Sequence, residues 1–252
     1  MTTADGQQGK AALVTGAASG IGRAVAARLA DDGMDVLSVD LRPDPDGPGT
    51  PFEADLTSAE ANEASVNAAL ERFGRLDVIV ANAGIQHVSP IAEFPVERWN
   101  TIVSLLLTSP FLLARYSWPA LKQSGAGRFI AIASVHGLVA SPFKAAYVSA
   151  KHGVLGLVKT LALEGAADGI TAAAVCPGYV RTPLVEKQIA DQAKAHNLPE
   201  EDVIEQVILA PHVVKRLIEP SEVADVVAFL LTPAGRAFTG VPVTLDQGWT
   251  AR

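Results

Sequence analysis

The sequence has a single cysteine, Cys176, and no uninterrupted apolar stretch that approaches the ~20 residues of a membrane-spanning helix. One cysteine cannot form an internal disulfide, which favours a reducing compartment. The first ten residues are polar and lack the apolar core of a signal peptide. These absences predict a cytoplasmic globular protein that is not bound to a membrane.

Positive charge is also scarce. Lys and Arg number 20 against 27 Asp and Glu, which gives a formal net charge of −7, and no run of Lys or Arg is present. This balance argues against a nucleic-acid groove and against an anionic membrane surface. The five histidines have no spacing typical of metal ligands. We therefore expect no nucleic acid, membrane or metal as a partner.

Apolar residues are plentiful, at 49% of the 252 residues, and short apolar runs alternate with longer helical patterns. Nearly continuous apolar runs are typical of strands that helices cover on both faces. The predicted strands are Ala11–Thr15, Asp35–Asp40, Pro51–Ala54, Asp77–Ala81, Arg128–Ala133, Ile170–Cys176 and Val241–Leu245. The predicted helices are Ile21–Asp32, Ser58–Phe73, Val96–Lys122, Ala145–Ala167 and Ser221–Leu231, the last with Ser221 as its N-cap.

This alternation of strands and helices predicts the fold class. Consecutive βαβ units with right-handed crossovers form a parallel, doubly wound, Rossmann-like sheet with helices on both faces. No linker or repeat interrupts the pattern, so residues 1–252 are predicted to form one domain. The segment 181–216 is polar and helical and fits the core pattern worst. Because long insertions near the carboxyl ends of strands are often functional, we interpret it as a lid over a substrate.

A glycine-rich turn follows the first predicted strand. Gly16 permits a tight turn, Gly20 permits close approach of the backbone to a pyrophosphate, and Gly22 permits close packing of helix on strand. The N–H groups at the start of the next helix favour a phosphate. The Gly-x-x-x-Gly-x-Gly spacing differs from the general dinucleotide fingerprint, so an ordinary glycine-rich turn is the alternative.

Asp40 ends the second strand, 18 residues after Gly22. A carboxylate there accepts hydrogen bonds from both ribose hydroxyls of adenosine and repels a 2′-phosphate, which predicts NAD over NADP. Asp55 and Leu56 follow the third strand, where they are candidates for contact with the adenine. The small residues Asn82-Ala83-Gly84 follow the fourth strand and are candidates for close approach to the cofactor.

The candidate catalytic residues are Ser134, Tyr147 and Lys151. Tyr147 and Lys151 are spaced i and i+4 in a predicted helix, so both side chains share a face. A neighbouring ammonium, helped by the positive nicotinamide ring, stabilises a phenolate and is expected to bring the phenol's pKa toward the working range. Ser134 ends the fifth strand, where its hydroxyl can stabilise charge on the reacting oxygen.

Together, Thr15–Gly22, Asn82-Ala83-Gly84, Ser134, Tyr147-x-x-x-Lys151 and Pro177-Gly178 resemble the short-chain dehydrogenase/reductase superfamily across essentially the whole chain. The resemblance implies that Tyr147 is the acid and base, that Ser134 positions the substrate oxygen and that Lys151 binds the nicotinamide ribose. It also implies contact between Thr182 and the nicotinamide carboxamide. The implied NAD-binding residues are Thr15, Gly16, Ser19, Gly20, Ile21, Gly22, Asp40, Asp55, Leu56, Asn82, Ala83, Gly84, Tyr147, Lys151, Pro177, Gly178, Val180 and Thr182.

Within the superfamily, the stretches 84–91, 133–141 and 180–189 and the C-terminal residues 248–252 resemble the D-3-hydroxybutyrate dehydrogenases. This implies reversible NAD-dependent oxidation of (R)-3-hydroxybutyrate to acetoacetate. The implied substrate residues, besides Ser134 and Tyr147, are Gln86, His136, Lys144, Gln188 and Trp249. Two potential cations and two amides beside a hydride-transfer site suit a small hydroxy acid or keto acid. The resemblance further implies a homotetramer.

Two positions depart from the family pattern. Leu106 stands where the family has an Asn that helps hold a water between the catalytic lysine and solvent, and Gln247 stands where a glycine is usual. Leucine cannot make that hydrogen bond, so slowed turnover is expected. The alternatives are a short-chain dehydrogenase acting on another secondary alcohol or ketone, and a catalytically impaired NAD-binding protein.

Overall fold

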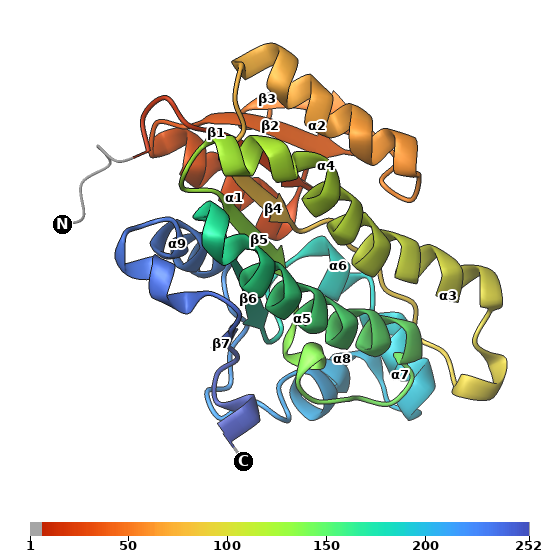
Figure 1. The fold of residues 1–252 in the computed structure, drawn as a ribbon. Helices are drawn as coiled ribbons and strands as arrows, with labels where there is room; N and C mark the ends of the chain where they lie inside the picture. The colour runs from red at the N-terminus through yellow and green to blue at the C-terminus, as the bar shows by residue number, and fades with distance from the viewer. Residues whose placement is uncertain (1–6, 252) are drawn as a thin grey trace.

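A seven-stranded parallel sheet forms the centre of the molecule in the computed structural model, which describes residues 7–251 (Figure 1). The strand order is β3-β2-β1-β4-β5-β6-β7, and neighbouring strands pair in parallel throughout. The strands are β1 (Ala11–Thr15), β2 (Asp35–Asp40), β3 (Thr50–Glu53), β4 (Val78–Ala81), β5 (Arg128–Ile132), β6 (Thr171–Pro177) and β7 (Pro242–Leu245). The predicted doubly wound, Rossmann-like sheet is confirmed.

Helices cover both faces of this sheet. The longer ones are α1 (Gly20–Asp31), α2 (Ala59–Phe73), α3 (Val96–Val103), α4 (Ser109–Gln123), α5 (Ala145–Gly165) and α9 (Pro220–Leu230). One apolar core lies between the sheet and α2, α4 and α5, and a second lies between the sheet and α1 and α9. The central strands β1, β4 and β5 are buried along their whole length, as strands enclosed by two cores must be.

The order of the strands reverses between β1 and β4, which are neighbours in the sheet although β2 and β3 lie between them in the chain. Loops from adjacent strands diverge at such a point and leave a crevice at the carboxyl ends of the strands. The glycine turn after β1 and the Asn82 segment after β4 both lie at this crevice. The topology therefore fixes where a ligand can bind.

Two predicted helices differ in detail. The helix expected over 96–122 is divided into α3, a π-helical turn at Ser104–Thr108 and α4. The prediction that Ser221 caps the last helix is wrong, because Glu219 is the N-cap and Pro220 occupies the first turn. The backbone N–H of Glu219 donates to the Glu222 carboxylate at 2.8 Å. This reciprocal arrangement replaces the hydroxyl cap that a serine offers.

The segment 181–216 is helical, as expected. It contains α6 (Pro183–Glu186), α7 (Ile189–His196), α8 (Glu200–Val203) and a π-helical turn at Ile204–Ile208. Its apolar side chains form a small cluster of their own with Tyr179 and Trp249. Ion pairs Arg181–Glu219 and Arg216–Glu222, at 2.9 and 2.7 Å, tie the two ends of the segment to the start of α9. The segment is thus anchored at its ends and packed separately from the two main cores.

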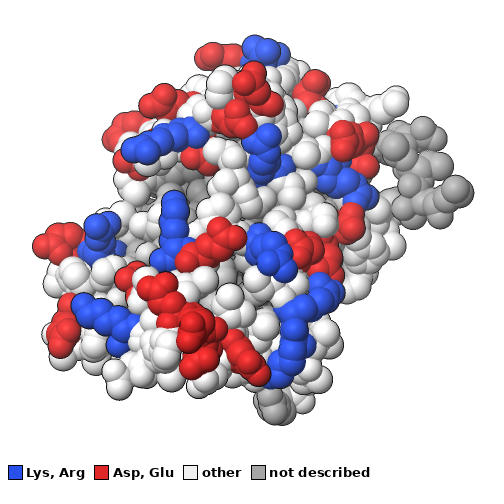
Figure 2. All heavy atoms as spheres, turned by 180° about the vertical axis from the view of Figure 1, so that it is seen from behind, with Lys and Arg blue, Asp and Glu red and all other residues white. Residues whose placement is uncertain are grey.

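Surface charge, helix length and the grouping of potential metal ligands relate to the nucleic-acid, membrane and metal partners that the sequence argues against. Figure 2 shows Lys and Arg interspersed with Asp and Glu over the described part of one face. No helix among residues 7–251 is long and apolar enough to cross a membrane. In the same residues, no group of three His, Cys, Asp or Glu side chains is arranged to hold a metal ion.

Candidate active site

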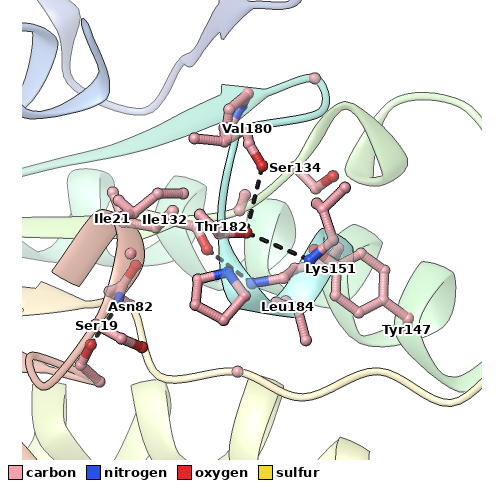
Figure 3. Close-up of a pocket in the computed structure, with 18 of the residues that line it drawn as sticks. Ser19, Ile21, Asn82, Ile132, Ser134, Tyr147, Lys151, Val180, Thr182 and Leu184 are labelled. Carbon is pink, nitrogen blue, oxygen red and sulfur yellow. Dashed lines mark hydrogen bonds between the residues drawn. The ribbon is translucent and has the colours of Figure 1, made fainter. Parts of the chain in front are cut away.

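A cavity of about 290 Å³ lies at the carboxyl ends of β1, β4, β5 and β6 (Figure 3). We call it the cofactor cavity. Most of the predicted NAD-binding residues line it, and they are Gly16, Ser19, Gly20, Ile21, Asp40, Asn82, Gly84, Tyr147, Lys151, Pro177, Gly178, Val180 and Thr182. Residues that the sequence did not indicate also line it, namely Ile132, Ala133, Pro183, Leu184 and Val185.

The glycine turn fits a pyrophosphate. A Cβ at Gly22 would lie 2.1 Å from the Gly16 carbonyl oxygen, and a Cβ at Gly16 would lie 2.8 Å from Asn82 Nδ2. Gly16 and Gly20 have φ of +66° and +55°, a region that side chains disfavour. The α1 N-cap residue, Ser19, makes no side-chain capping hydrogen bond. Unoccupied N–H groups at a helix start are suited to a phosphate, so the residues present fit a dinucleotide.

Asp40 lies at the wall of this cavity in a defined orientation. Its carboxylate accepts hydrogen bonds from the backbone N–H groups of Ala18 and Arg42, both at 3.1 Å. The first of these bonds joins the end of β2 to the glycine turn. The carboxylate is thereby held in a fixed orientation at the wall of the cofactor cavity.

Five predicted cofactor residues do not line the cavity. The Thr15 hydroxyl accepts hydrogen bonds from the N–H groups of Asn82 and Ala83, each at 2.9 Å, and so joins β1 to β4. Gly22 acts through the packing described above. Leu56 is buried in the apolar core, and the Asp55 carboxylate accepts a hydrogen bond from the Thr57 hydroxyl at 2.7 Å. The adenine contact of Asp55 and Leu56 stays a prediction.

The three candidate catalytic side chains all line the cofactor cavity (Figure 3). Lys151 Nζ lies 5.6 Å from the centre of the Tyr147 ring, as the i, i+4 spacing predicts. The same Nζ donates a hydrogen bond of 2.7 Å to the Ile132 carbonyl at the end of β5. Ser134 lies two residues after the end of β5 and lines the cavity together with Tyr147. Helix α5 and strand β5 thus place the phenol, hydroxyl and ammonium around one point.

The lowering of the Tyr147 pKa by Lys151 and the nicotinamide ring stays a prediction, and burial acts against it. Burial raises the pKa of the Tyr147 phenol, and the neighbouring Ser134 side chain offsets part of that rise. Burial also lowers the pKa of Lys151 to about 8. A phenolate at neutral pH therefore requires more positive charge than Lys151 alone supplies.

A second, smaller cavity of about 50 Å³ adjoins the first at Ser134 and Tyr147. We call it the substrate cavity. All seven predicted substrate residues line it, and they are Gln86, Ser134, His136, Lys144, Tyr147, Gln188 and Trp249. They come from four separate stretches of the chain, which the fold brings together beside the candidate catalytic residues.

Lys144 is the charged group of the substrate cavity. Only 3% of the residue is exposed, and Nζ donates a hydrogen bond of 2.8 Å to the Tyr179 hydroxyl. No ion pair within residues 7–251 includes Lys144. Burial lowers its pKa to about 8, so the side chain is still largely charged at neutral pH. A buried ammonium without a carboxylate partner is costly unless an anion is bound.

His136 is not the second cation that the sequence predicts. Burial, with the nearby Lys144 charge, lowers the pKa of its imidazole to about 3. Nδ1 lies 3.4 Å from Ser134 Oγ, and Nε2 lies 2.9 Å from Ser141 Oγ. His136 is therefore a neutral hydrogen-bonding group, and Lys144 supplies the positive charge alone.

The glutamines contribute amides to the substrate cavity. Gln188 is 9% exposed, its Nε2 donates to the Leu184 carbonyl at 2.8 Å, and its buried Oε1 has no hydrogen-bond partner in the structure. Gln86 Oε1 accepts a hydrogen bond from the N–H of His87 at 3.2 Å. An unpartnered amide oxygen in a small cavity favours a ligand that carries a donor, such as a hydroxyl group.

Trp249 closes one side of the substrate cavity. Its ring stacks on Tyr179, with centroids 5.7 Å apart, and meets His136 edge to face at 5.2 Å. The Asp246 carboxylate accepts hydrogen bonds from the N–H groups of Gly248 and Thr250, at 3.1 and 2.9 Å, and so fixes the turn that carries Trp249. Gln247 has φ of +56° in this turn, which explains why a glycine suits that position.

Tyr179 is the important residue that sequence reasoning missed. It is 8% exposed, accepts the hydrogen bond from Lys144 and stacks on Trp249. His212, which is fully buried, packs against both rings. The only signal for Tyr179 is its place directly after Pro177-Gly178, and the contacts that give it a role come from distant segments.

Leu106 lies in the π-helical turn and is 1% exposed. It packs in an apolar cluster with Ile102, Ala146 and Ala150, against which the Tyr147 ring also lies. A π-helical turn inside an α-helix is often found at a functional site. The side of Tyr147 that faces α3 is therefore apolar in this protein.

Comparison with known proteins assigns the family. A family model described as enoyl-(acyl carrier protein) reductase matches residues 16–250. The chain is 44% identical to the uncharacterized oxidoreductase YxjF of Bacillus subtilis, over 96% of this chain and 98% of the relative. It is 43% identical to a D-beta-hydroxybutyrate dehydrogenase of Rhizobium meliloti, over 96% and 99%. This chain belongs to the short-chain dehydrogenase/reductase family.

Solved structures agree with this assignment. The ligand-free aldohexose dehydrogenase of Thermoplasma acidophilum is similar with a TM-score of 0.91 at 30% identity, over 98% of this chain and 96% of that one. As a short-chain dehydrogenase/reductase, the protein is an oxidoreductase that acts on a CH–OH group. Members of the family use nicotinamide cofactors, which the glycine turn and the cofactor cavity fit.

Proposed function

We propose that this short-chain dehydrogenase/reductase catalyses the reversible, NAD-dependent oxidation of (R)-3-hydroxybutyrate to acetoacetate. The observation that carries the proposal is the buried Lys144 ammonium, which has no carboxylate partner among the described residues and lies beside Ser134 and Tyr147. A D-beta-hydroxybutyrate dehydrogenase among the relatives, similar over nearly the whole of both chains, supports the same substrate.

Asp40 supports NAD as the nicotinamide cofactor. Its carboxylate is fixed by two backbone N–H groups at the cavity wall, where it can accept hydrogen bonds from ribose hydroxyls and repel a phosphate. The glycine turn and the start of α1 would hold the pyrophosphate, and Lys151 and Thr182 would lie beside the nicotinamide end. When bound, NAD supplies the acceptor for the hydride from substrate C3.

Tyr147 is the proposed general base. It takes the hydroxyl proton of the substrate while Ser134 donates a hydrogen bond to the same oxygen. Because burial opposes the phenolate, Lys151 and the positive ring of the oxidised cofactor must together lower the Tyr147 pKa in the complex. The raised pKa without ligand predicts that proton abstraction becomes favourable only after the cofactor has bound.

The substrate carboxylate is proposed to bind the Lys144 ammonium. An ammonium has three donors, and one of them is used by Tyr179. Gln86 and Gln188 add amide groups, and Trp249, packed on His136, closes one side of the cavity. We propose that residues 181–216 act as a lid that carries Gln188 over the bound acid.

An NADH absorbance assay on the full-length protein tests this proposal. The substrates are (R)-3-hydroxybutyrate, its (S)-enantiomer and (R)-2-butanol, which replaces the carboxylate by a methyl group. We expect turnover with the (R)-acid far above that with either comparison compound. Equal kcat/KM for the (R)-acid and the neutral alcohol would contradict the carboxylate site and favour another secondary alcohol as substrate.

Leu106 favours a second candidate, a short-chain dehydrogenase/reductase that binds NAD but turns over slowly. Leucine cannot hold the water that the family asparagine helps hold, and the surroundings of Leu106 are apolar. NADH binding measured by fluorescence, without substrate oxidation above background in the assay above, would support this candidate.

We propose that the protein assembles as a homotetramer. Large apolar side chains are exposed on the outer helices, among them Phe111 on α4 at 45% and Leu163 on α5 at 82%. Surfaces of this kind favour burial against another copy. Light scattering is expected to give four times the chain mass, and a monomer would contradict the proposal.

A further inference from the structure

The substrate cavity shares a wall with a larger cavity. This neighbour has a volume of about 420 Å³, against about 50 Å³ for the substrate cavity, and we call it the rear cavity. Residues 140–142 line it, together with residues from α7 and from the π-helical turn at Ile204–Ile208. Lys144, Tyr179 and Trp249 line both cavities, and we call these three side chains the partition. The partition therefore stands between a small space beside the candidate catalytic residues and a large one.

The members of the partition contact one another. Lys144 Nζ donates a hydrogen bond of 2.8 Å to the Tyr179 hydroxyl. The Tyr179 and Trp249 rings stack with centroids 5.7 Å apart and planes inclined by only 20°. The ammonium and the two rings thus form one continuous unit.

The two rings of the partition are also held from behind. His212 is fully buried and packs against both of them. Its Nε2 accepts a hydrogen bond of 3.5 Å from the backbone N–H of Tyr179, while Asp246 fixes the turn that carries Trp249. Rings in such packed surroundings have no free space into which to move. The position of the partition is therefore fixed by the fold.

A fixed partition limits the acid that the substrate cavity can hold. In the proposed complex, Ser134 and Tyr147 bind the hydroxyl group and Lys144 binds the carboxylate, so both ends of the molecule are fixed. (R)-3-hydroxybutyrate has one methylene between its hydroxyl carbon and its carboxylate. An acid with more methylenes there would push its carboxylate toward the rings of Tyr179 and Trp249. Extra carbons on the other side of the hydroxyl carbon leave this distance unchanged.

The rear cavity could hold a carboxylate that passed the two rings. Lys144 lines it, so such a group would still lie near the ammonium. Ser141 adds a hydroxyl group, and Gln192 adds an amide that is 2% exposed and whose buried Oε1 has no hydrogen-bond partner in the structure. An amide whose oxygen is unpartnered can turn and present its NH₂ group to an anion. The rings of the partition, and not the chemistry beyond them, are therefore what excludes a longer acid.

We propose that Tyr179 and Trp249 are specificity-determining residues, which restrict oxidation to acids with a short distance between hydroxyl carbon and carboxylate. This inference rests on the proposed oxidation of a hydroxy acid and adds which acids are excluded and by which side chains. Neither ring takes part in proton or hydride transfer. Removing either ring joins the two cavities and extends the range of substrates in one direction only.

The test compares three acids in the NADH absorbance assay on the full-length protein. They are (R)-3-hydroxybutyrate and two isomeric six-carbon acids, (R)-5-hydroxyhexanoate and (R)-3-hydroxyhexanoate. Only the 5-hydroxy isomer has a longer distance between hydroxyl carbon and carboxylate. In Tyr179→Ala we expect kcat/KM for the 5-hydroxy isomer, relative to that for (R)-3-hydroxybutyrate, to rise about tenfold or more, since a single methylene that does not fit costs 10–200-fold. The same ratio for the 3-hydroxy isomer should be unchanged.

Tyr179→Phe is the matched control because it keeps the ring and removes only the hydroxyl group. All three acids use Lys144, so an effect on that ammonium cancels in the ratios, which should equal those of the unmodified protein. Trp249→Ala removes the other ring, which is only half-buried, and makes the same test where Tyr179→Ala does not fold.

Three results would overturn the inference. They are unchanged ratios in both alanine variants, equal gains for the two six-carbon acids, and loss of turnover with all three acids in variants that still bind NADH. If the unmodified protein oxidises (R)-3-hydroxybutyrate and one of these results is found, the inference fails alone. If the unmodified protein oxidises none of the acids, the proposed function fails and the inference fails with it.

Discussion

The cofactor cavity and the substrate cavity meet at Ser134 and Tyr147 but are built from different parts of the chain. Backbone groups and glycines form the phosphate end of the cofactor cavity, which two neighbouring loops hold in place through Thr15, Asp40 and Asn82. Buried side chains form the substrate cavity, where Lys144 is 3% and His136 4% exposed. The first cavity depends on local conformation, whereas the second depends on which side chains the fold removes from water.

Substitutions in the two cavities are therefore expected to have different effects on cofactor binding. Substitutions in the substrate cavity alter charge and hydrogen bonding without disturbing the glycine turn, so cofactor binding is expected to survive them. Substitutions in the glycine turn must move backbone, because a Cβ at Gly22 meets a carbonyl oxygen at 2.1 Å.

The largest effect is expected where the two cavities meet. Tyr147→Phe removes the proposed base and keeps the ring, so turnover should fall by about 10²–10⁴. NADH should still bind, because the turn and Asp40 are untouched. NADH absorbance with (R)-3-hydroxybutyrate, together with NADH fluorescence titration, measures both. Retained turnover in a normally folded Tyr147→Phe protein would remove Tyr147 from the mechanism.

The next effect is confined to the substrate cavity. Lys144→Met keeps the length of the side chain and removes its charge, so binding of an acid in the transition state should lose about 2–5 kcal/mol, roughly 30-fold or more in kcat/KM. The kcat/KM for (R)-2-butanol should be unchanged, since that alcohol has no carboxylate. An equal loss on both substrates would show that Lys144 supports the structure and not recognition.

Asp40→Asn changes only the cofactor cavity. Removal of the negative charge should raise the ratio of kcat/KM with NADP to that with NAD by about tenfold or more, because juxtaposed like charges cost several kcal/mol. Asparagine keeps an oxygen that can accept from Ala18 or Arg42, so the loop should stay in place. Steady-state kinetics with both cofactors provide the measurement, and an unchanged ratio would show that Asp40 does not discriminate between them.

The smallest effect is expected at Leu106. Leu106→Asn places an amide beside Tyr147 and should raise the turnover number severalfold, while a buried amide without full hydrogen bonding costs about 1–3 kcal/mol of stability. The turnover number should therefore rise while the midpoint of thermal unfolding falls. An unchanged turnover number and pH profile would contradict the expectation.

Periodicity and spacing predict much of this molecule. The strand and helix pattern predicts the doubly wound sheet, and the glycines and Asp40 fall at its crevice because topology places the end of β1 there. The i, i+4 spacing predicts the neighbourhood of Tyr147 and Lys151 correctly. These features depend on short stretches of chain and on one topological rule, so no knowledge of tertiary packing is needed.

Other properties depend on burial, which spacing does not reveal. The sequence shows His136 as a potential cation, whereas burial lowers the pKa of its imidazole and keeps it neutral, and burial also raises the pKa of Tyr147. Tyr179 acquires its role from Lys144 and Trp249, which are distant in sequence. The π-helical turn at Leu106 packs against Ala146 and Ala150 of α5 and has no local signal in an otherwise helical pattern.

The buried Lys144 ammonium is proposed to recognise a carboxylate. The most direct test is the ratio of kcat/KM for (R)-3-hydroxybutyrate to kcat/KM for (R)-2-butanol, measured between about pH 6 and about pH 10. Tyr147 and Lys151 serve both substrates, so their titration cancels in the ratio. The Lys144 pKa is about 8, so the side chain is charged below that pH and neutral above it. The ratio should be constant below about pH 8 and fall roughly tenfold per pH unit above it, and in Lys144→Met it should be low at every pH. A ratio in the unmodified protein that does not change over this range would contradict the claim.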